Sequence, residues 1–167
     1  MSAPEDLNDL YSGELADLWS ANDQMERTVK KLAGKASDPA LKEMLQKSQE
    51  GIAQHTEVLK QLLAATGEKV KKEHCKGMEG LVAEAIKHTT EEAPKKGPVL
   101  DAVIIAQFQL MTHYGIAGFG TAASFANTLG NKDAKKQLDA LTKSTYGGDQ
   151  YMTKLAETLV NIDAKDE

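Results

Sequence analysis

Hydrophobic residues recur in steps of three and four along four long stretches of the chain, which predicts four amphipathic helices. Near the midpoint of each stretch, small or polar residues interrupt the hydrophobic stripe. The interruptions are Asn22 in the first stretch, Ser48, Gly51 and His55 in the second, Thr112 and Gly115 in the third, and Thr145 and Gly148 in the fourth. Four such stripes predict a helix bundle with an unusual layer at mid-height.

Proline, glycine and capping residues indicate where the helices begin and end. They place the helices at about 4–34, 39–66, 98–129 and 131–162, joined in the middle by a connection over 67–97. Pro4 is tolerated in a first helical turn, and Asp38 followed by Pro39 is typical of a helix N-terminus. Within the connection, Met78 to His88 predicts a short extra helix, so the second hairpin can cross over the first.

Two helix hairpins would bring the interruptions to one height. Asn22 and Gly51 each lie roughly 14 residues, or about 21 Å, from the turn at Ala36. The interruptions of the third and fourth helices are likewise symmetric about Gly130. In antiparallel helices joined by short turns, equal distance from the turn means equal height, so we expect one polar layer across the bundle.

Composition narrows the class of protein. The 167 residues suit one domain, 1–167, and the low aromatic content of 5% favours an all-α protein. The net charge is −5 and no basic stripe stands out, so we expect neither nucleic acid nor a membrane as partner. There is no leader-like N-terminus and no continuous apolar run of about 18 residues, which predicts a cytoplasmic protein. The single cysteine, Cys75, excludes an internal disulfide and is expected to be a structural thiol.

Several short motifs between about Leu7 and Ala156 carry a family resemblance. They are Leu-Ala-Asp-Leu-Trp-Ser-Ala at 15–21, Cys-Lys-Gly-Met-Glu-Gly-Leu at 75–81, Asp-Ala at 101–102, His-Tyr-Gly-Ile-Ala at 113–117 and Leu-Gly at 129–130. Through them the chain resembles the ferritin-like, YciE/YciF-type bacterial stress-protein family, whose function is unassigned. The resemblance implies an antiparallel ferritin-like four-helix bundle with one long crossover, a homodimer, and a carboxylate-rich di-metal centre in the usual members.

The positions that match the family's metal ligands hold other residues here. The first-helix Glu is Asn22, and the third-helix Glu-His-Tyr-Glu is Thr-His-Tyr-Gly at 112–115. The second-helix His, Glu, Thr and Gln correspond to Ser48, Gly51, Ile52 and His55. The fourth-helix Glu-rich run is Lys-Ser-Thr at 143–145, with Asp149 kept a turn later. We therefore expect no di-iron or di-manganese site and no cofactor.

The chemistry of the layer supports that expectation without the family. Two iron or manganese ions in a bundle need about four carboxylates together with imidazoles. The layer offers an imidazole, an amide and hydroxyl groups, and His55 with Asp149 could hold at most one weakly bound ion. His55 has two interpretations: a neutral core histidine hydrogen-bonded to Asn22, Thr112 or Thr145, or a ligand for a metal or small molecule.

The layer itself leaves further alternatives. Either the helices close up at the glycines, or large neighbours (Trp19, Phe108, Tyr114 and Tyr146) fill the space beside them, or a cavity remains for water or a ligand. The interpretation we favour is a non-catalytic, stress-associated bundle protein. The alternatives are small-molecule binding in a mid-bundle pocket formed by Asn22, Ser48, Gly51, His55, Thr112, Gly115, Thr145 and Gly148, or residual metal binding with ferroxidase activity.

Overall fold

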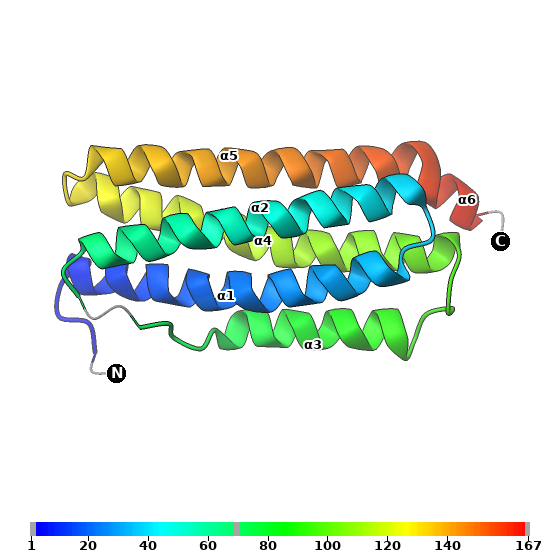
Figure 1. Cartoon of the computed structure of the whole chain (residues 1–167), viewed down its shortest axis with the longest axis horizontal. Helices are drawn as coiled ribbons and strands as arrows, with labels where there is room; N and C mark the ends of the chain where they lie inside the picture. Colours follow the sequence, from blue (N-terminus) through cyan, green and yellow to red (C-terminus); the bar gives the residue numbers. More distant parts are fainter. Residues whose placement is uncertain (1–2, 69–70, 166–167) are drawn as a thin grey trace.

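Four long helices run side by side, and a shorter one lies along them, in the computed structural model, which describes residues 3–68 and 71–165 (Figure 1). The helices are α1 (Leu7–Lys35), α2 (Pro39–Ala65), α3 (Lys76–Thr90), α4 (Pro98–Thr128) and α5 (Lys132–Leu155), followed by a π-helical turn, η1 (Ala156–Val160), and by α6 (Asn161–Lys165). The predicted ferritin-like four-helix bundle, with a long crossover that carries an extra helix, is confirmed.

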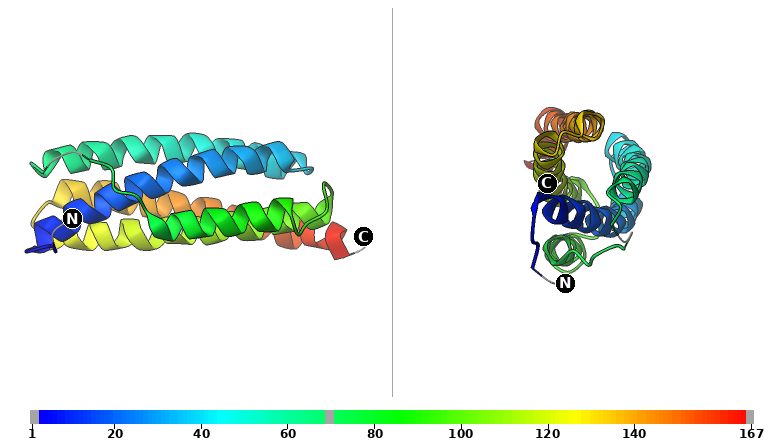
Figure 2. Two further views of the ribbon diagram at one scale, coloured as in Figure 1. Left: turned by 90° about the horizontal axis from the view of Figure 1, so that it is seen from below. Right: turned by 90° about the vertical axis from the view of Figure 1, so that its left-hand side faces the viewer.

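The bundle consists of two antiparallel hairpins, α1–α2 and α4–α5, that pack against each other. The crossover returns the chain along the bundle, and α3 packs on the outside against α1 and α4 (Figure 2). Within the bundle α1 contacts α4 and α2 contacts α5, so every long helix has antiparallel neighbours (Figure 1). This topology puts the midpoints of all four long helices close together.

Capping residues decide where the first two helices begin. Asp38 caps α2 as predicted: its carboxylate accepts a hydrogen bond from the Leu41 amide at 2.8 Å, and Pro39 is the first helical residue. The start predicted at Pro4 is wrong, because α1 begins at Leu7. Asp6 has an extended backbone and its carboxylate accepts from the Asp9 amide at 2.9 Å, which satisfies an otherwise free N–H of the first turn.

The fourth long helix is not one uninterrupted α-helix over 131–162. After Leu155 the chain makes a π-helical turn, in which hydrogen bonds span five residues instead of four. The next buried residue is therefore Val160, which is 2% exposed, whereas Leu159, four residues after the buried Leu155, is 38% exposed. The π turn thus shifts the core-facing register by one residue.

Hydrophobic side chains form two clusters, one on each side of the polar layer. One contains Met25, Ile52 and Phe108, and the other contains Leu18 and Phe119. The layer of interruptions therefore separates two halves of the core.

Helix α4 is the most apolar of the long helices. One 18-residue window of α4 has a mean hydropathy of 1.2, and by length and composition this helix could cross a membrane, although no continuous apolar run predicts it. Half of that window is buried inside the bundle. A core helix of a soluble bundle meets the same criterion, so the finding is weak evidence for a membrane span.

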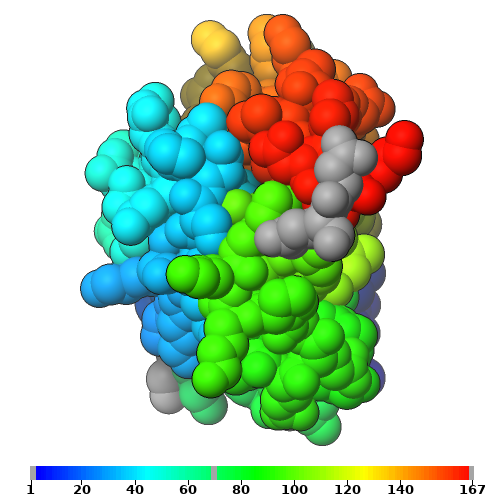
Figure 3. Space-filling model, turned by 90° about the vertical axis from the view of Figure 1, so that its right-hand side faces the viewer, coloured from blue at the N-terminus to red at the C-terminus, as the bar shows by residue number. Residues whose placement is uncertain are grey.

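At one end of the bundle, the start of α4 is tied to the turn between α1 and α2 (Figure 3). Asp101, only 2% exposed, accepts hydrogen bonds from the amides of Ser37 and Asp38, both at 2.8 Å. The Gly97 amide, just before α4, donates to the Ser37 hydroxyl at 2.9 Å. These bonds join the two hairpins and fix their relative height.

Candidate functional site

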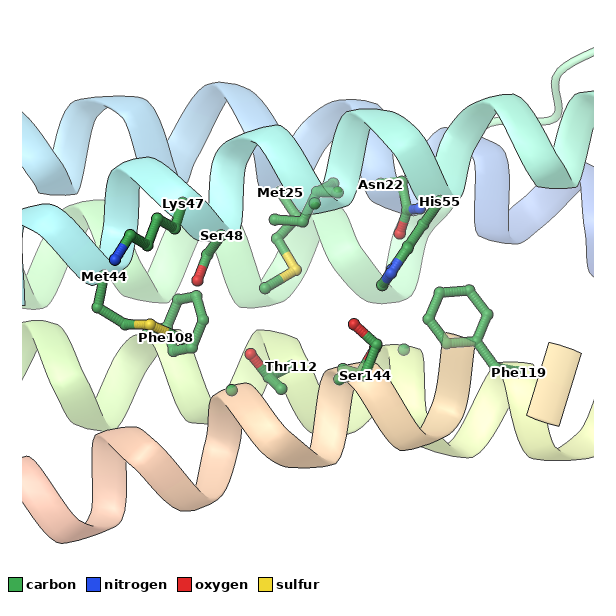
Figure 4. Close-up of a pocket in the computed structure, with 15 residues that line it drawn as sticks. Asn22, Met25, Met44, Lys47, Ser48, His55, Phe108, Thr112, Phe119 and Ser144 are labelled. Carbon is green, nitrogen blue, oxygen red and sulfur yellow. The ribbon is translucent and has the colours of Figure 1, made fainter. Parts of the chain in front are cut away.

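A cavity of about 260 Å³ lies at the level where the four hydrophobic stripes are interrupted (Figure 4). Its lining contains all eight residues predicted for the polar layer: Asn22, Ser48, Gly51, His55, Thr112, Gly115, Thr145 and Gly148. The other lining residues are Met25, Met44, Lys47, Ile52, Phe108, Phe119 and Ser144. The structure thus brings the predicted residues together around one space, and its ligand-binding role stays a prediction.

The cavity has a buried floor and a partly exposed rim. Helices α1 and α4 supply the floor, where Asn22 is 5% exposed and Thr112 is 2% exposed. Helices α2 and α5 supply the rim: Gly51 is half-buried, and Lys47 and Ser144 are exposed. The cavity therefore opens to solvent along the seam between α2 and α5.

Two polar atoms on the floor have no partner. Asn22 Nδ2 and Thr112 Oγ1 are buried and make no hydrogen bond within residues 3–68 and 71–165. A buried polar group without a partner costs about 1–3 kcal/mol. In Figure 4, Asn22 enters the cavity from α1 and Thr112 from α4 on the other side. Both side chains thus line the cavity, and each has a polar atom without a hydrogen-bond partner.

His55 contributes a neutral imidazole. Burial without a compensating negative charge lowers its pKa, so the ring is uncharged at neutral pH. The predicted hydrogen bond to Asn22, Thr112 or Thr145 is wrong for the described residues: Asn22 Nδ2 and Thr112 Oγ1 have no partner, and the Thr145 hydroxyl donates to the Leu141 carbonyl at 2.7 Å. The imidazole meets the ring of Phe119 edge-on, with 5.8 Å between centroids.

The glycines differ in the space that they leave. A Cβ atom added to Gly51 would meet no heavy atom within 4 Å. At Gly115 it would lie 3.4 Å from the Phe119 ring, and at Gly148 it would lie 3.4 Å from the end of Met44. Gly51 is therefore the glycine of this layer beside which the cavity is open.

Of the four large side chains considered as fillers of the layer, Phe108 lines the cavity and the other three do not. The Tyr114 hydroxyl donates to Asp17 at 2.7 Å and accepts from the Cys75 thiol at 3.0 Å. Tyr146 is 46% exposed, and Trp19 lies beneath the Lys60 ammonium, 5.1 Å from the ring centroid. With these rings engaged elsewhere, the space remains open.

The same network explains the single cysteine. Cys75 is fully buried, and its thiol accepts a hydrogen bond from the Met78 amide at 3.3 Å at the start of α3. Burial raises the pKa of the thiol. The expected structural role of Cys75 agrees with these contacts, since a buried thiol with a raised pKa is unreactive.

The donor set does not fit the di-metal centre that the ferritin-like resemblance implies. The cavity lining contains no carboxylate, and residues 3–68 and 71–165 contain no group of three or more His, Cys, Asp or Glu side chains placed to hold a metal ion. Asp149 does not line the cavity: it accepts from Gln109 at 3.0 Å and lies 3.1 Å from His113 Nε2. His55 and Asp149, the weak candidates for one ion, therefore have different surroundings.

The pattern of hydrophobic stripes did not single out Met44, Lys47 or Ser144 as site residues. Met44 lies one helical turn before Ser48, and Lys47 and Ser144 lie directly before Ser48 and Thr145. All three belong to a wider face of their helix than the hydrophobic stripe covers. All three lie within about 100° of an interruption around the helix axis, a range that includes residues beside the stripe.

Comparison with known proteins places the chain among bacterial relatives. Residues 6–165 match the family described as Domain of unknown function (DUF892). Protein YciF of Escherichia coli strain K12 is 32% identical over 162 residues, which cover 96% of each chain. The alignment thus covers nearly the whole length of both chains.

Solved structures agree with this similarity. The crystal structure of the E. coli stress protein YciF superimposes with a TM-score of 0.87 at 32% identity, covering 95% of this chain and 99% of the other. YcfI from Rhodopseudomonas palustris gives 0.85 at 28% identity, covering 92% and 97%. A protein from Xanthomonas campestris pv. campestris gives 0.77 at 13% identity over 96% and 98% of the two chains, which shows the shared fold alone.

Proposed function

Because the chain belongs to the DUF892 family of YciF-like proteins, we propose that it is a non-catalytic bundle protein whose mid-bundle cavity binds a small organic molecule. One observation carries this proposal. Asn22 and Thr112 leave buried, unpartnered polar atoms on the floor of a cavity of about 260 Å³. A cavity lined mainly by apolar groups, with a few convergent polar groups, is the usual form of a small-molecule site. The association with stress extends to this chain the description of the E. coli relative.

The surroundings of the two serines support a non-catalytic role. Ser48 and Ser144 lie inside α2 and α5, where the backbone amides are used in helical hydrogen bonds. A nucleophilic serine needs free amides nearby to stabilise an oxyanion, and neither position offers them. His55 lines the cavity, and the described lining contains no carboxylate that could orient its imidazole. The layer is therefore suited to binding and lacks the parts of a hydrolase.

Filling the cavity tests the proposal. Gly51→Leu places a side chain into the open space beside Gly51, whereas Gly120→Leu adds the same group at an exposed position of α4 that also has no heavy atom within 4 Å. Native mass spectrometry of the gently purified protein should show a bound small molecule in the wild type and in Gly120→Leu. The Gly51→Leu protein should be free of it, with unchanged helical circular dichroism.

Either of two results would overturn the proposal. One is a wild-type protein that carries no small molecule and binds none of a set of monocyclic aromatic compounds at millimolar concentration. The other is a bound species that Gly51→Leu retains as fully as Gly120→Leu does, because that species would lie elsewhere on the protein.

A further inference from the structure

The cavity also restricts the chemistry of its occupant. Resting on the proposed function, we propose that the ligand is an uncharged molecule with a ring-sized apolar body and a carbonyl oxygen that accepts a hydrogen bond from Asn22 Nδ2. Four features of the lining lead to this description: the volume, the lack of internal charge, the unpartnered donor and the aromatic walls.

The volume determines the size of the body. An apolar cavity of about 150 Å³ admits benzene. The cavity here measures about 260 Å³, which leaves room for a ring with a short substituent.

The charge of the lining excludes an ionic head group on the floor. The lining contains one charged side chain, Lys47, which belongs to the rim and already lies 2.6 Å from Glu43. The Lys47 side chain is 67% exposed, so water screens it. An anion or cation at the depth of Asn22 and Thr112 would have no partner of opposite charge, and burying an unpaired ion is strongly unfavourable. The occupant is therefore uncharged.

The unpartnered atoms determine the polar group. A side-chain amide nitrogen only donates hydrogen bonds, so Asn22 Nδ2 requires an acceptor. The Thr112 hydroxyl can donate or accept, and it provides a second polar contact from the opposite helix. A carbonyl oxygen has two lone pairs and satisfies Asn22 without bringing a donor that the floor would leave unpaired. A ketone, an ester or a tertiary amide fulfils this requirement.

The walls determine the orientation of the apolar body. Phe119 and His55 meet edge-on near Asn22, and Figure 4 shows Phe108 and Met44 toward the other end of the cavity. Rings and thioether sulfur both make favourable contacts with an aromatic body. The carbonyl oxygen thus lies at Asn22, and the ring points toward Phe108.

Four matched probes test this assignment by isothermal titration calorimetry at pH 7. They are acetophenone, ethylbenzene as its hydrocarbon counterpart, benzoate as an anion and benzylamine as a cation. One buried hydrogen bond corresponds to up to about a tenfold change in affinity. Acetophenone should therefore bind roughly tenfold more tightly than ethylbenzene, and both should bind more tightly than the two ions.

Variants locate the hydrogen bond. Asn22→Leu keeps the approximate volume and removes the donor, so acetophenone should lose its advantage over ethylbenzene. Asn127→Leu makes the same change at an exposed position of α4 and should preserve that advantage. Gly51→Leu should abolish binding of both probes.

The outcomes separate this inference from the proposed function. If ethylbenzene binds as tightly as acetophenone, or if Asn22→Leu leaves their ratio unchanged, the polar assignment is wrong while the cavity remains a binding site. Preference for benzoate or benzylamine refutes the uncharged ligand in the same way. If no probe binds and the purified protein carries no small molecule, the proposed function fails together with the inference.

Discussion

Short side chains keep the mid-bundle layer open. Helix α2 faces the cavity with Ser48 and Gly51, and α4 faces it with Thr112 and Gly115, where a bundle core usually has leucine or isoleucine. Glycine inside a helix costs about 1 kcal/mol relative to alanine. At Gly51 no close contact explains this cost, because nothing lies where its Cβ would be. The sequence here favours space over helix stability.

Alanine substitutions at two glycines should therefore have opposite effects. Gly51→Ala should raise the free energy of unfolding by about 0.5–1 kcal/mol, because it improves helix propensity and meets no neighbour. Gly118→Ala should lower it by about 1–3 kcal/mol, because the new Cβ would lie 2.3 Å from Cδ2 of the fully buried Leu18. Urea unfolding measured by circular dichroism checks both, and a stabilising Gly118→Ala would contradict the packing seen between α1 and α4.

His55 should make the stability of the bundle sensitive to mild acid. Burial lowers the pKa of His55 in the folded protein below the ordinary value of 6.5, so the unfolded chain binds a proton more readily than the folded one. Stability from this residue is fully present above pH 6.5 and decreases as the pH falls below it. Between pH 7 and pH 5 the wild type should lose more unfolding free energy than His55→Gln does.

The exposed histidine in the crossover provides the control for this pH dependence. The side chain of His74 is 60% exposed and lies 3.0 Å from Glu79 on the surface. His74→Gln should therefore keep the acid sensitivity that His55→Gln removes. Equal slopes for the wild type and His55→Gln would show that the buried imidazole does not determine the acid response.

For single residues, the height along the bundle could be predicted from the sequence, whereas the contacts between side chains could not. Counting from the turns put Asn22, Gly51 and Thr112 at one height, because rise per residue is constant in a helix. Whether Asn22 meets His55 depends on shifts of less than an ångström between helices, which no spacing rule contains. The unpartnered atoms on the floor therefore became visible only in the structure.

Among the elements, caps and hairpins followed from local residues, whereas the π turn did not. Asp38 with Pro39 begins α2 as predicted, because both residues act on their own helix. In the π turn after α5, packing against the core decides the register: Val160 is buried and Leu159 is exposed. Both residues are hydrophobic, so the sequence pattern cannot tell which one faces the core.

Asp101 should be the most sensitive polar residue at the end where the hairpins meet. Its carboxylate accepts from the amides of Ser37 and Asp38, and Asp101→Ala leaves both without that partner. The loss should lower the free energy of unfolding by about 1–3 kcal/mol. Asp133→Ala, at an exposed position in the first turn of α5, should change it by less than about 0.5 kcal/mol. Chemical denaturation measures both, and equal effects would mean that the bonds to the α1–α2 turn add nothing.

For the whole molecule, the two hydrophobic clusters explain how the bundle tolerates an open layer. Each half of the core extends well beyond the layer, with Leu32 and Leu41 in one cluster and Leu15 and Leu59 in the other, all fully buried. The cavity therefore lies between two stable regions rather than within one. The homodimer expected from the family resemblance stays a prediction, and sedimentation equilibrium would test it.

The same arrangement predicts how the protein responds to metal ions. A ligand that binds only the folded state raises the melting temperature by an amount that grows with the logarithm of its concentration relative to its dissociation constant. The cavity lining offers an imidazole, an amide and hydroxyls in place of carboxylates. Mn²⁺ or Fe²⁺ in large excess over the protein should therefore leave the melting temperature unchanged. Ferrous iron oxidation with the protein should be no faster than with iron alone.

Restoring carboxylates gives the matched positive control for that experiment. The triple variant Asn22→Glu, Thr112→Glu and Gly115→Glu places three carboxylates around the cavity next to His55. Without metal it should melt below the wild type, because like charges in a poorly hydrated space repel one another. Mn²⁺ should then raise its melting temperature, since the ion neutralises those charges and carboxylate oxygens are ligands that it prefers. Two tightly held ions per wild-type chain, or a wild-type shift as large as that of the variant, would show that this bundle has kept a metal centre despite its substituted ligands.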